Sequence, residues 1–187
     1  MSVLVDEDTR VLVQGITGGA GQFHAERMRA YGTDVVAGVV PGRGGTETAG
    51  VPVYDTVAAA VREREPTAAV TFVPPAVAAD ALFEAIDAEL DVVVAVTEGI
   101  PIQEMLRVRR RLAAVDTRLI GPNTPGVITP GAAKVGILPG EIFTPGSVGV
   151  VSRSGTLTYE IVDALTERGF GQSTAIGIGK RHRREQD

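Results

Sequence analysis

Cysteine is absent from the 187-residue chain. This excludes a disulfide framework, a zinc site built on thiolates and a catalytic thiol, and it fits a reducing compartment. Histidine is scarce, with two residues, and neither stands in a pattern typical of a catalytic triad or a metal cluster. No apolar run is long enough to span a bilayer, and the acidic start lacks the basic region of a signal or transit peptide. We therefore expect a cytoplasmic protein with no membrane partner.

Basic residues are also the minority: 18 Lys and Arg stand against 23 Asp and Glu, for a formal net charge of -5. This balance does not favour binding to nucleic acid or to an anionic membrane, although local sites for small anions stay open. With 44% hydrophobic and 22% charged residues, the composition suits one or two globular domains with a real core.

Hydrophobic patterning alternates between two kinds of segment. Short runs rich in Val and Ile predict strands that are covered on both faces, at residues 11–13, 34–40, 68–73, 91–96 and 118–120. Apolar stripes with helical spacing predict helices between them, at residues 23–31, 76–88 and 102–114. This order predicts an α/β fold with a doubly wound parallel sheet.

The alternation stops in a Pro- and Gly-rich stretch, residues 121–146, where we place a domain boundary and a candidate short strand at 133–138. After it we expect one strand-helix-strand unit, with strands at 147–151 and 173–178 and a helix at 157–168. One such unit is too small to make its own core. It must pack on the first domain or on a partner, or the chain is cut short.

A glycine-rich loop, residues 15–21, joins the first predicted strand to the first predicted helix. At this place free backbone N–H groups and the helix dipole can hold a phosphate. The spacing is Gly-x-x-Gly-x-x-Gly and differs from the strict dinucleotide fingerprint. The alternative is a glycine turn that serves only tight packing of strand and helix.

Arg43 follows the second predicted strand, in the sequence Pro41-Gly42-Arg43-Gly44-Gly45. An NAD-binding protein normally has Asp or Glu there, so NAD is disfavoured. A guanidinium instead suits a phosphate on the ribose, as in NADP or the 3′-phosphorylated adenosine of coenzyme A (CoA). The alternative is a solvated loop charge.

Further polar groups follow later strands and would line one crevice at the carboxyl edge of the sheet. Glu98 can bind a ligand or cap the next helix, and Asn123 can simply stabilise its own turn. A second strand-to-helix loop, residues 151–156, carries hydroxyl groups and Arg153, which slightly favours an anion pocket over capping alone. Tyr159 can face that pocket or be a half-buried structural residue.

Taken together, seven ordered motifs resemble the α subunit of succinate–CoA ligase, from residue 1 to about 179. They are Gly15-Ile-Thr17-Gly18 with Gly21, Phe23 and His24; Tyr31-Gly-Thr33; Pro41-Gly-Arg43-Gly-Gly45; Thr97-Glu-Gly-Ile-Pro101; Ile120-Gly-Pro-Asn123; Gly126-Val-Ile-Thr-Pro-Gly131; and Ser152-Arg-Ser-Gly-Thr-Leu-Thr-Tyr159.

The resemblance implies a Rossmann-like CoA-binding domain at 1–125, a linker at 126–146 and the start of a flavodoxin-like ligase domain at 147–187. It implies interconversion of succinyl-CoA, phosphate and ADP or GDP with succinate, CoA and the triphosphate. The implied partner is a β subunit with an ATP-grasp fold, which would hold Mg²⁺ and ATP or GTP.

Site residues carry over from the resemblance by position. Those expected to contact CoA are Thr17, Gly18, Gly19, Ala20, Arg43, Val96, Thr97 and Glu98. Those expected at the substrate or phosphoryl site are Ser154, Thr156 and Tyr159. Arg43 stands where the family usually has Lys, and Thr124 where it usually has Cys.

The family continues after residue 179 with most of its second domain, including the histidine that becomes phosphorylated. Here residues 180–187 form a divergent, arginine-rich tail, which we interpret as the result of truncation or a frameshift. His182 does not inherit the histidine's role, so we expect no turnover by this chain alone. The rival hypotheses are a stand-alone CoA-binding or regulatory module and an NADP-dependent oxidoreductase.

Overall fold

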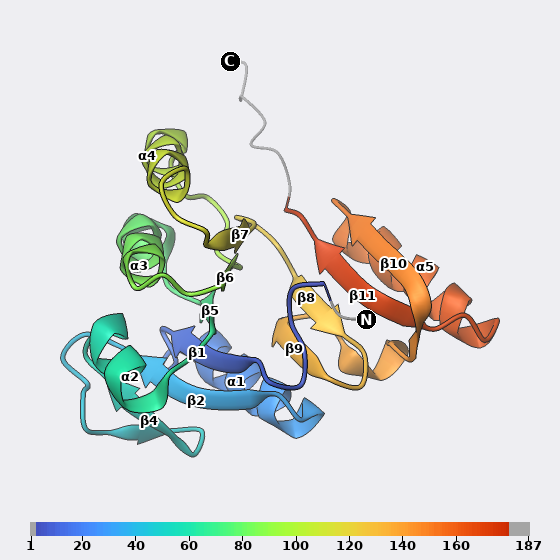
Figure 1. Cartoon of the computed structure of the whole chain (residues 1–187), viewed down its shortest axis with the longest axis horizontal. Helices are drawn as coiled ribbons and strands as arrows, with labels where there is room; N and C mark the ends of the chain where they lie inside the picture. The colour runs from blue at the N-terminus through green and yellow to red at the C-terminus, as the bar shows by residue number, and fades with distance from the viewer. Residues whose placement is uncertain (1–2, 180–187) are drawn as a thin grey trace.

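Residues 3–179 are described by a computed structural model, in which two β-sheets lie side by side with helices packed against them (Figure 1). The first sheet has the strand order β3-β4-β2-β1-β5-β6-β7, and all its neighbouring strands are parallel except β3 and β4. Its strands are β1 (Arg10–Gln14), β2 (Asp34–Val39), β3 (Glu47–Thr48), β4 (Val51–Tyr54), β5 (Ala68–Thr71), β6 (Val92–Ala95) and β7 (Arg118–Ile120). The predicted doubly wound parallel sheet is confirmed.

Helices cover both faces of this sheet. They are α1 (Gly19–Tyr31), α2 (Val57–Arg64), α3 (Pro75–Asp87) and α4 (Ile102–Leu112). One core cluster joins the strands to α1 through Ala25 and Met28, and another joins them to the remaining helices through residues such as Leu82 and Val108. Because both faces are covered, β5 and β6 are buried along their whole length. No helix in the described part of the chain combines the length and apolar character needed to cross a membrane.

The first sheet differs from the prediction in two places. The α1 helix begins at Gly19 instead of residue 23, because glycines with low helix propensity form its first turn. The β3–β4 hairpin and α2 were not predicted. Their apolar signal is weak, since α2 buries only Val57 and Ala60.

The second sheet has the order β10-β11-β8-β9. Its strands are β8 (Gly126–Thr129), β9 (Ala133–Gly136), β10 (Pro145–Ser152) and β11 (Gln172–Gly177), with a short 3-10 helix η1 (Gly140–Ile142) and the helix α5 (Gly155–Glu167). The parallel pair β10 and β11, connected by α5, is the predicted strand-helix-strand unit. The expected linker, residues 126–146, is more than a connection, because its β8–β9 hairpin completes this sheet.

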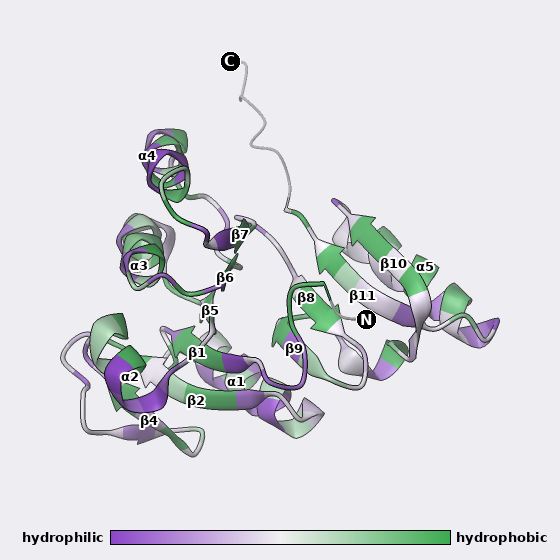
Figure 2. Ribbon diagram, in the orientation of Figure 1, coloured by the Kyte–Doolittle hydropathy of each residue, from purple (hydrophilic) through white to green (hydrophobic). Residues whose placement is uncertain are grey.

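That hairpin also fastens the second sheet to the first domain. Val127 and Val135 belong to the same core cluster as Met28 of α1. The hydroxyl of Thr33 donates a hydrogen bond to the carbonyl of Lys134 (3.0 Å) and accepts one from the Lys134 N–H (2.9 Å). The hydrophobic colour of β1 and β8 in Figure 2 marks the strands that meet this shared interior. The second sheet therefore packs on the first domain, which is one of the outcomes that the sequence led us to expect.

The turn between β1 and α1 generates a first prediction about stability. A Cβ atom at Gly21 would overlap the carbonyl oxygen of Gly15, whereas a Cβ at Gly19 would meet no atom within 4 Å. We expect Gly21→Ala to lower the free energy of unfolding by about 1–3 kcal/mol, since the backbone must shift. The matched variant Gly19→Ala should keep or slightly raise stability. Urea denaturation of both variants tests this, and equal stabilities would contradict the described turn.

Candidate functional site

The turn that leads from β1 into α1 is held by backbone hydrogen bonds. Gly15 has a left-handed φ of 80°, and its N–H donates to the carbonyl of Val39 on the neighbouring strand (2.9 Å). The N–H of Gly18 then donates back to the carbonyl of Gly15 (3.1 Å). The loop is thereby fixed at the carboxyl edge of the sheet, close to the point where strand order reverses between β1 and β5.

This turn leaves the first amides of α1 open. The N-cap is Gly18, which has no side chain to cap the helix, and the first turn contains no acidic residue. Within residues 3–179 the N–H groups of Gly19, Ala20 and Gly21 have no acceptor. Thr17 through Ala20 are exposed, whereas Gly21 is buried. Free N–H groups at the positive end of a helix dipole form an anion site.

The glycine spacing is only partly explained by packing. Gly15 and Gly21 are needed structurally, since a Cβ at Gly15 would lie 2.9 Å from the carbonyl oxygen of Phe72 and one at Gly21 would overlap Gly15. Gly19 faces open space, so packing does not require glycine there. A small residue at Gly19 instead lets a ligand approach the backbone closely.

The neighbouring loops are tied together at the same edge. The hydroxyl of Thr97 donates to the carbonyl of Val73 (2.8 Å), and the N–H of Asn123 donates to the carbonyl of Thr97 (3.1 Å). The side-chain amide of Asn123 donates to the carboxylate of Glu98 (2.9 Å). The N-cap of α4 is Pro101, and within residues 3–179 Glu98 accepts no hydrogen bond from the first amides of that helix. Asn123 does more than stabilise its own turn.

Arg43 lies on the exposed loop after β2. Its N–H donates to the carbonyl of Val40 (3.1 Å), and its own carbonyl accepts from the hydroxyl of Thr46 (2.7 Å), so the loop backbone is ordered. Its guanidinium has no ion pair among the described residues. It can therefore meet a phosphate without first breaking an internal bond.

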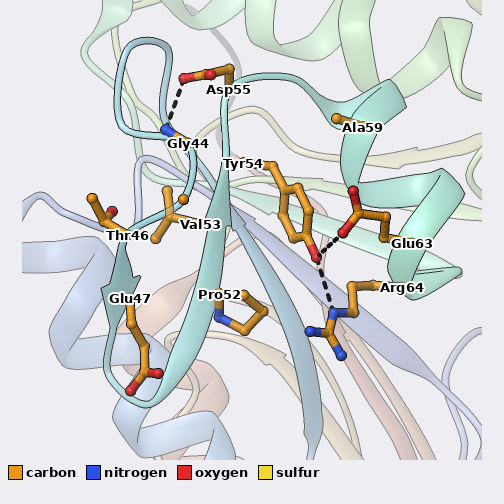
Figure 3. A pocket seen from close by; sticks show the side chains of 11 residues that line it. Gly44, Thr46, Glu47, Pro52, Val53, Tyr54, Asp55, Ala59, Glu63 and Arg64 are labelled. Atoms are coloured by element: carbon orange, nitrogen blue, oxygen red, sulfur yellow. Dashed lines mark hydrogen bonds between the residues drawn. The ribbon is translucent and has the colours of Figure 1, made fainter.

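Beside this loop lies a groove of about 580 Å³ between the β3–β4 hairpin and α2 (Figure 3). Its main polar side chains already bond one another. The hydroxyl of Tyr54 donates to Glu63 (3.1 Å) and accepts from Arg64 (3.0 Å), and Asp55 accepts from the N–H of Gly44 (2.8 Å). Although this groove is larger than the cleft described next, Tyr54, Glu63 and Arg64 already bond one another and Asp55 bonds the backbone, so we place the candidate site at the sheet edge.

A cleft of about 240 Å³ opens between the two sheets. It brings Val96, at the end of β6, together with the loop that begins α5. The residues that line it are Val96, Asn123, Thr124, Pro125, Ile137, Arg153, Ser154, Gly155, Thr156 and Tyr159. Burial raises the pKa of the half-buried Tyr159 phenol, which stays neutral at physiological pH. The cleft thus unites one residue of the expected CoA set with all three of the expected substrate set.

Sequence patterns did not identify Ile137 as part of this cleft. Ile137 belongs to the segment treated as a linker, and its position depends on the β8–β9 hairpin, after which its N–H donates to the carbonyl of Pro125 (2.8 Å). The only local signal was the candidate strand at 133–138.

The hydroxyl groups at the start of α5 have separate tasks. Ser154 is the N-cap, and its side chain accepts from the N–H of Leu157 (3.3 Å). The N–H groups of Gly155 and Thr156 have no acceptor within residues 3–179, and the side chain of Thr156 is exposed. Capping therefore explains Ser154 but leaves two amides and one hydroxyl open to an anion.

The ring of His24 is packed against an aromatic side chain and has no hydrogen-bond partner at its buried nitrogen. Its ring stacks on Phe72 with centroids 5.4 Å apart, and its buried Nδ1 has no hydrogen-bond partner. Burial, followed by the charges of Lys134 and Arg27, lowers its pKa below 6.5. His182 lies outside the described residues. Within the described residues there is also no group of three His, Cys, Asp or Glu side chains that could hold a metal ion.

Comparison with known proteins decides between the interpretations of this edge. The sequence pattern described as "CoA binding domain" matches residues 6–99, which include the glycine loop, Arg43 and the loop after β6. The chain belongs to the CoA-binding domain family. The NADP interpretation of the glycine loop is therefore not favoured.

Longer relatives extend the likeness beyond this CoA-binding domain. The chain is 58% identical over 179 residues to succinate–CoA ligase [ADP-forming] subunit alpha 2 of Archaeoglobus fulgidus, covering 96% of this chain and 62% of that protein. It is 55% identical over 181 residues to the corresponding alpha subunit of Aquifex aeolicus, covering 96% and 59%. The chain thus spans about three fifths of the length of these relatives.

A solved structure shows the same arrangement of CoA-binding domain and second sheet. ATP citrate lyase from Methanothrix soehngenii, in complex with citrate and coenzyme A, superposes with a TM-score of 0.79 at 26% identity. The superposition covers 95% of this chain and 32% of that one.

The different roles of Ser154 and Thr156 at the start of α5 lead to a prediction about stability. Ser154→Ala should lower the free energy of unfolding by about 1 kcal/mol, because it removes the N-cap bond. Thr156→Ala, two residues away, should leave the free energy of unfolding within about 0.5 kcal/mol of the parent chain, since its exposed hydroxyl has no described partner. Urea denaturation measures both. Equal losses in the two variants would contradict the assignment of the cap to Ser154.

His24 generates a prediction about pH. Its pKa is lowered in the folded state, so the unfolded chain binds more protons as the pH falls from above 6.5 toward that folded pKa, and stability declines in this window. His24→Gln removes this titration, and its stability should decline less over the same window. NMR titration of the imidazole reports the pKa directly. A value at or above 6.5 would contradict the packed, unpartnered ring.

Proposed function

We propose that this chain is the CoA-binding part of a succinate–CoA ligase α subunit of the ADP-forming type. The single observation that carries the proposal is the open helix N-terminus at Gly19–Gly21 within a matched CoA-binding domain. The identity of more than half of all residues to two α subunits supports the ligase assignment over a stand-alone CoA-binding module.

The residues at the sheet edge fit CoA. The amides of Gly19, Ala20 and Gly21 suit its pyrophosphate, because they are free and lie at the positive end of α1. The exposed guanidinium of Arg43 suits its ribose 3′-phosphate, which accepts charge-assisted hydrogen bonds. Thr17 and Gly18 and the loop of Val96, Thr97 and Glu98 complete the proposed CoA contacts. Glu98 is already oriented by its bond with Asn123.

The cleft between the sheets would serve the acyl and phosphoryl chemistry. In the proposed reaction, succinyl-CoA, phosphate and ADP are interconverted with succinate, CoA and ATP. CoA, when bound, supplies the thiol that carries the acyl group. The free N–H groups of Gly155 and Thr156 would stabilise phosphoryl oxygens, helped by the Thr156 hydroxyl, while Ser154 keeps the helix start in place. The neutral phenol of Tyr159 would contact the substrate from the cleft wall.

The proposed partner is a succinate–CoA ligase β subunit with an ATP-grasp fold, which would hold Mg²⁺ and the nucleotide. The name "subunit alpha" of the relatives supports a partner subunit. We assign the role of the phosphorylated histidine to no residue of this chain, since His24 is packed on Phe72. The cytoplasm is the proposed compartment.

Isothermal titration with CoA tests the proposal. We expect saturable binding of CoA and none of NADPH. Arg43→Gln should weaken CoA binding about tenfold, the loss of one charge-assisted contact. The matched control Arg110→Gln replaces an exposed arginine of α4, outside the site, and should bind CoA like the parent chain.

The possible results separate the hypotheses. Binding of NADPH in preference to CoA, or no heat with CoA, would overturn the proposal. Co-purification with a coexpressed β subunit supports the ligase role. Binding of CoA by a chain that captures no β subunit would favour the stand-alone module instead.

A further inference from the structure

A nearly buried lysine lies away from the proposed CoA site. Lys134, in β9, is 3% exposed, and its Nζ lies 5.7 Å from the ring centroid of Tyr31. Within residues 3–179 its ammonium group has no ion pair and no hydrogen-bond acceptor. The aliphatic part of Lys134 is buried, while its Nζ keeps contact with solvent, since it is not among the fully buried side-chain atoms that lack a hydrogen-bond partner. An ammonium that no described residue neutralises can attract an anion from solvent.

A second cation lies near Lys134. Arg27 of α1 has a guanidinium that stacks over Phe23 at 5.2 Å, and its Nη1 is 4.0 Å from the carboxylate of Glu141. Glu141 is largely exposed and is the one carboxylate that acts on Lys134 in the described structure. Of the other titratable neighbours, Tyr31 accepts a hydrogen bond from the N–H of Gly131 (3.1 Å), and the pKa of His24 is lowered, which favours its neutral form.

The charge balance is therefore positive. Burial has the largest effect on the pKa of Lys134 and lowers it. The negative charge of Glu141 raises this pKa, and the positive charge of Arg27 lowers it further. Two cations share a single exposed carboxylate that is in salt-bridge contact with only one of them. Such an arrangement favours an added anion over the existing solvent-exposed pair.

These groups line an open, shallow cavity of about 260 Å³, formed by Arg27, Ala30, Tyr31, Lys134, Gly140 and Glu141. Its walls come from α1, β9 and η1, so it spans the junction between the first domain and the second sheet. A ligand there would bridge both units.

We propose that this cavity binds a small oxyanion of the phosphate class between Lys134 and Arg27. The ammonium and the guanidinium would both donate to its oxygens, and Glu141 would move aside into solvent. The site is separate from the glycine loop and from the start of α5. It does not depend on the proposed ligase function.

NMR of a chain carrying ¹³C-labelled lysine tests this site specifically, because the Lys134 Cε resonance reports its own environment and pKa. Phosphate is titrated at constant ionic strength, and succinate is titrated separately as a carboxylate probe. We expect a saturable shift of the Lys134 signal with phosphate and a rise in the Lys134 pKa, since a bound anion favours the charged form. Succinate should act more weakly.

Two variants should change the affinity for phosphate in opposite directions. Arg27→Gln, whose native side chain is 54% exposed and can be replaced without a cavity, should weaken phosphate binding about tenfold. Glu141→Gln removes the competing carboxylate and should tighten it. Arg110→Gln, on α4, is the matched control and should match the parent chain.

Three results would overturn the proposal: no saturable change of the Lys134 signal with phosphate, stronger binding of succinate than of phosphate, or identical affinities in Arg27→Gln and Arg110→Gln. Each can occur whether or not CoA binds, so failure here is distinct from failure of the proposed function. CoA affinity of Arg27→Gln, measured in parallel, should equal that of the parent chain.

Discussion

The structure depends on how closely the start of α1 approaches the end of β1. Gly21 lies directly over the carbonyl of Gly15, a contact that no side chain larger than hydrogen permits. This approach aims the helix axis at the carboxyl edge of the sheet and leaves three successive amides without acceptors. The same steric constraint that packs the helix on the strand therefore leaves open the amides of the proposed anion site.

The second sheet extends this arrangement because it shares a core with the first domain. The β8–β9 hairpin places Val127 and Val135 against α1, and the paired bonds between Thr33 and Lys134 fix their register. The loop that starts α5 is thereby brought opposite Val96, the residue that follows β6, across one cleft.

Sequence patterns predicted the elements whose signal is local. The strands around Val70 and Val93 are continuous apolar runs, and closely spaced glycines are typical of a strand-to-helix turn. These two strands and the glycine loop were therefore predicted at the correct positions. The hairpin 126–136 was assigned to a linker because its burial comes from α1, about one hundred positions earlier in the chain. The bond between Asn123 and Glu98, and the unpaired state of Lys134, likewise depend on contacts between distant segments. Periodicity carries no information about such contacts.

The central claim is that backbone amides at the start of α1 hold the pyrophosphate of CoA. Amide ¹H–¹⁵N shift mapping during a CoA titration tests it most directly. The account predicts that the largest changes fall on Gly19, Ala20 and Gly21, with smaller changes at Gly155 and Thr156. Changes confined to the groove between the β3–β4 hairpin and α2, with the α1 amides unmoved, would contradict it.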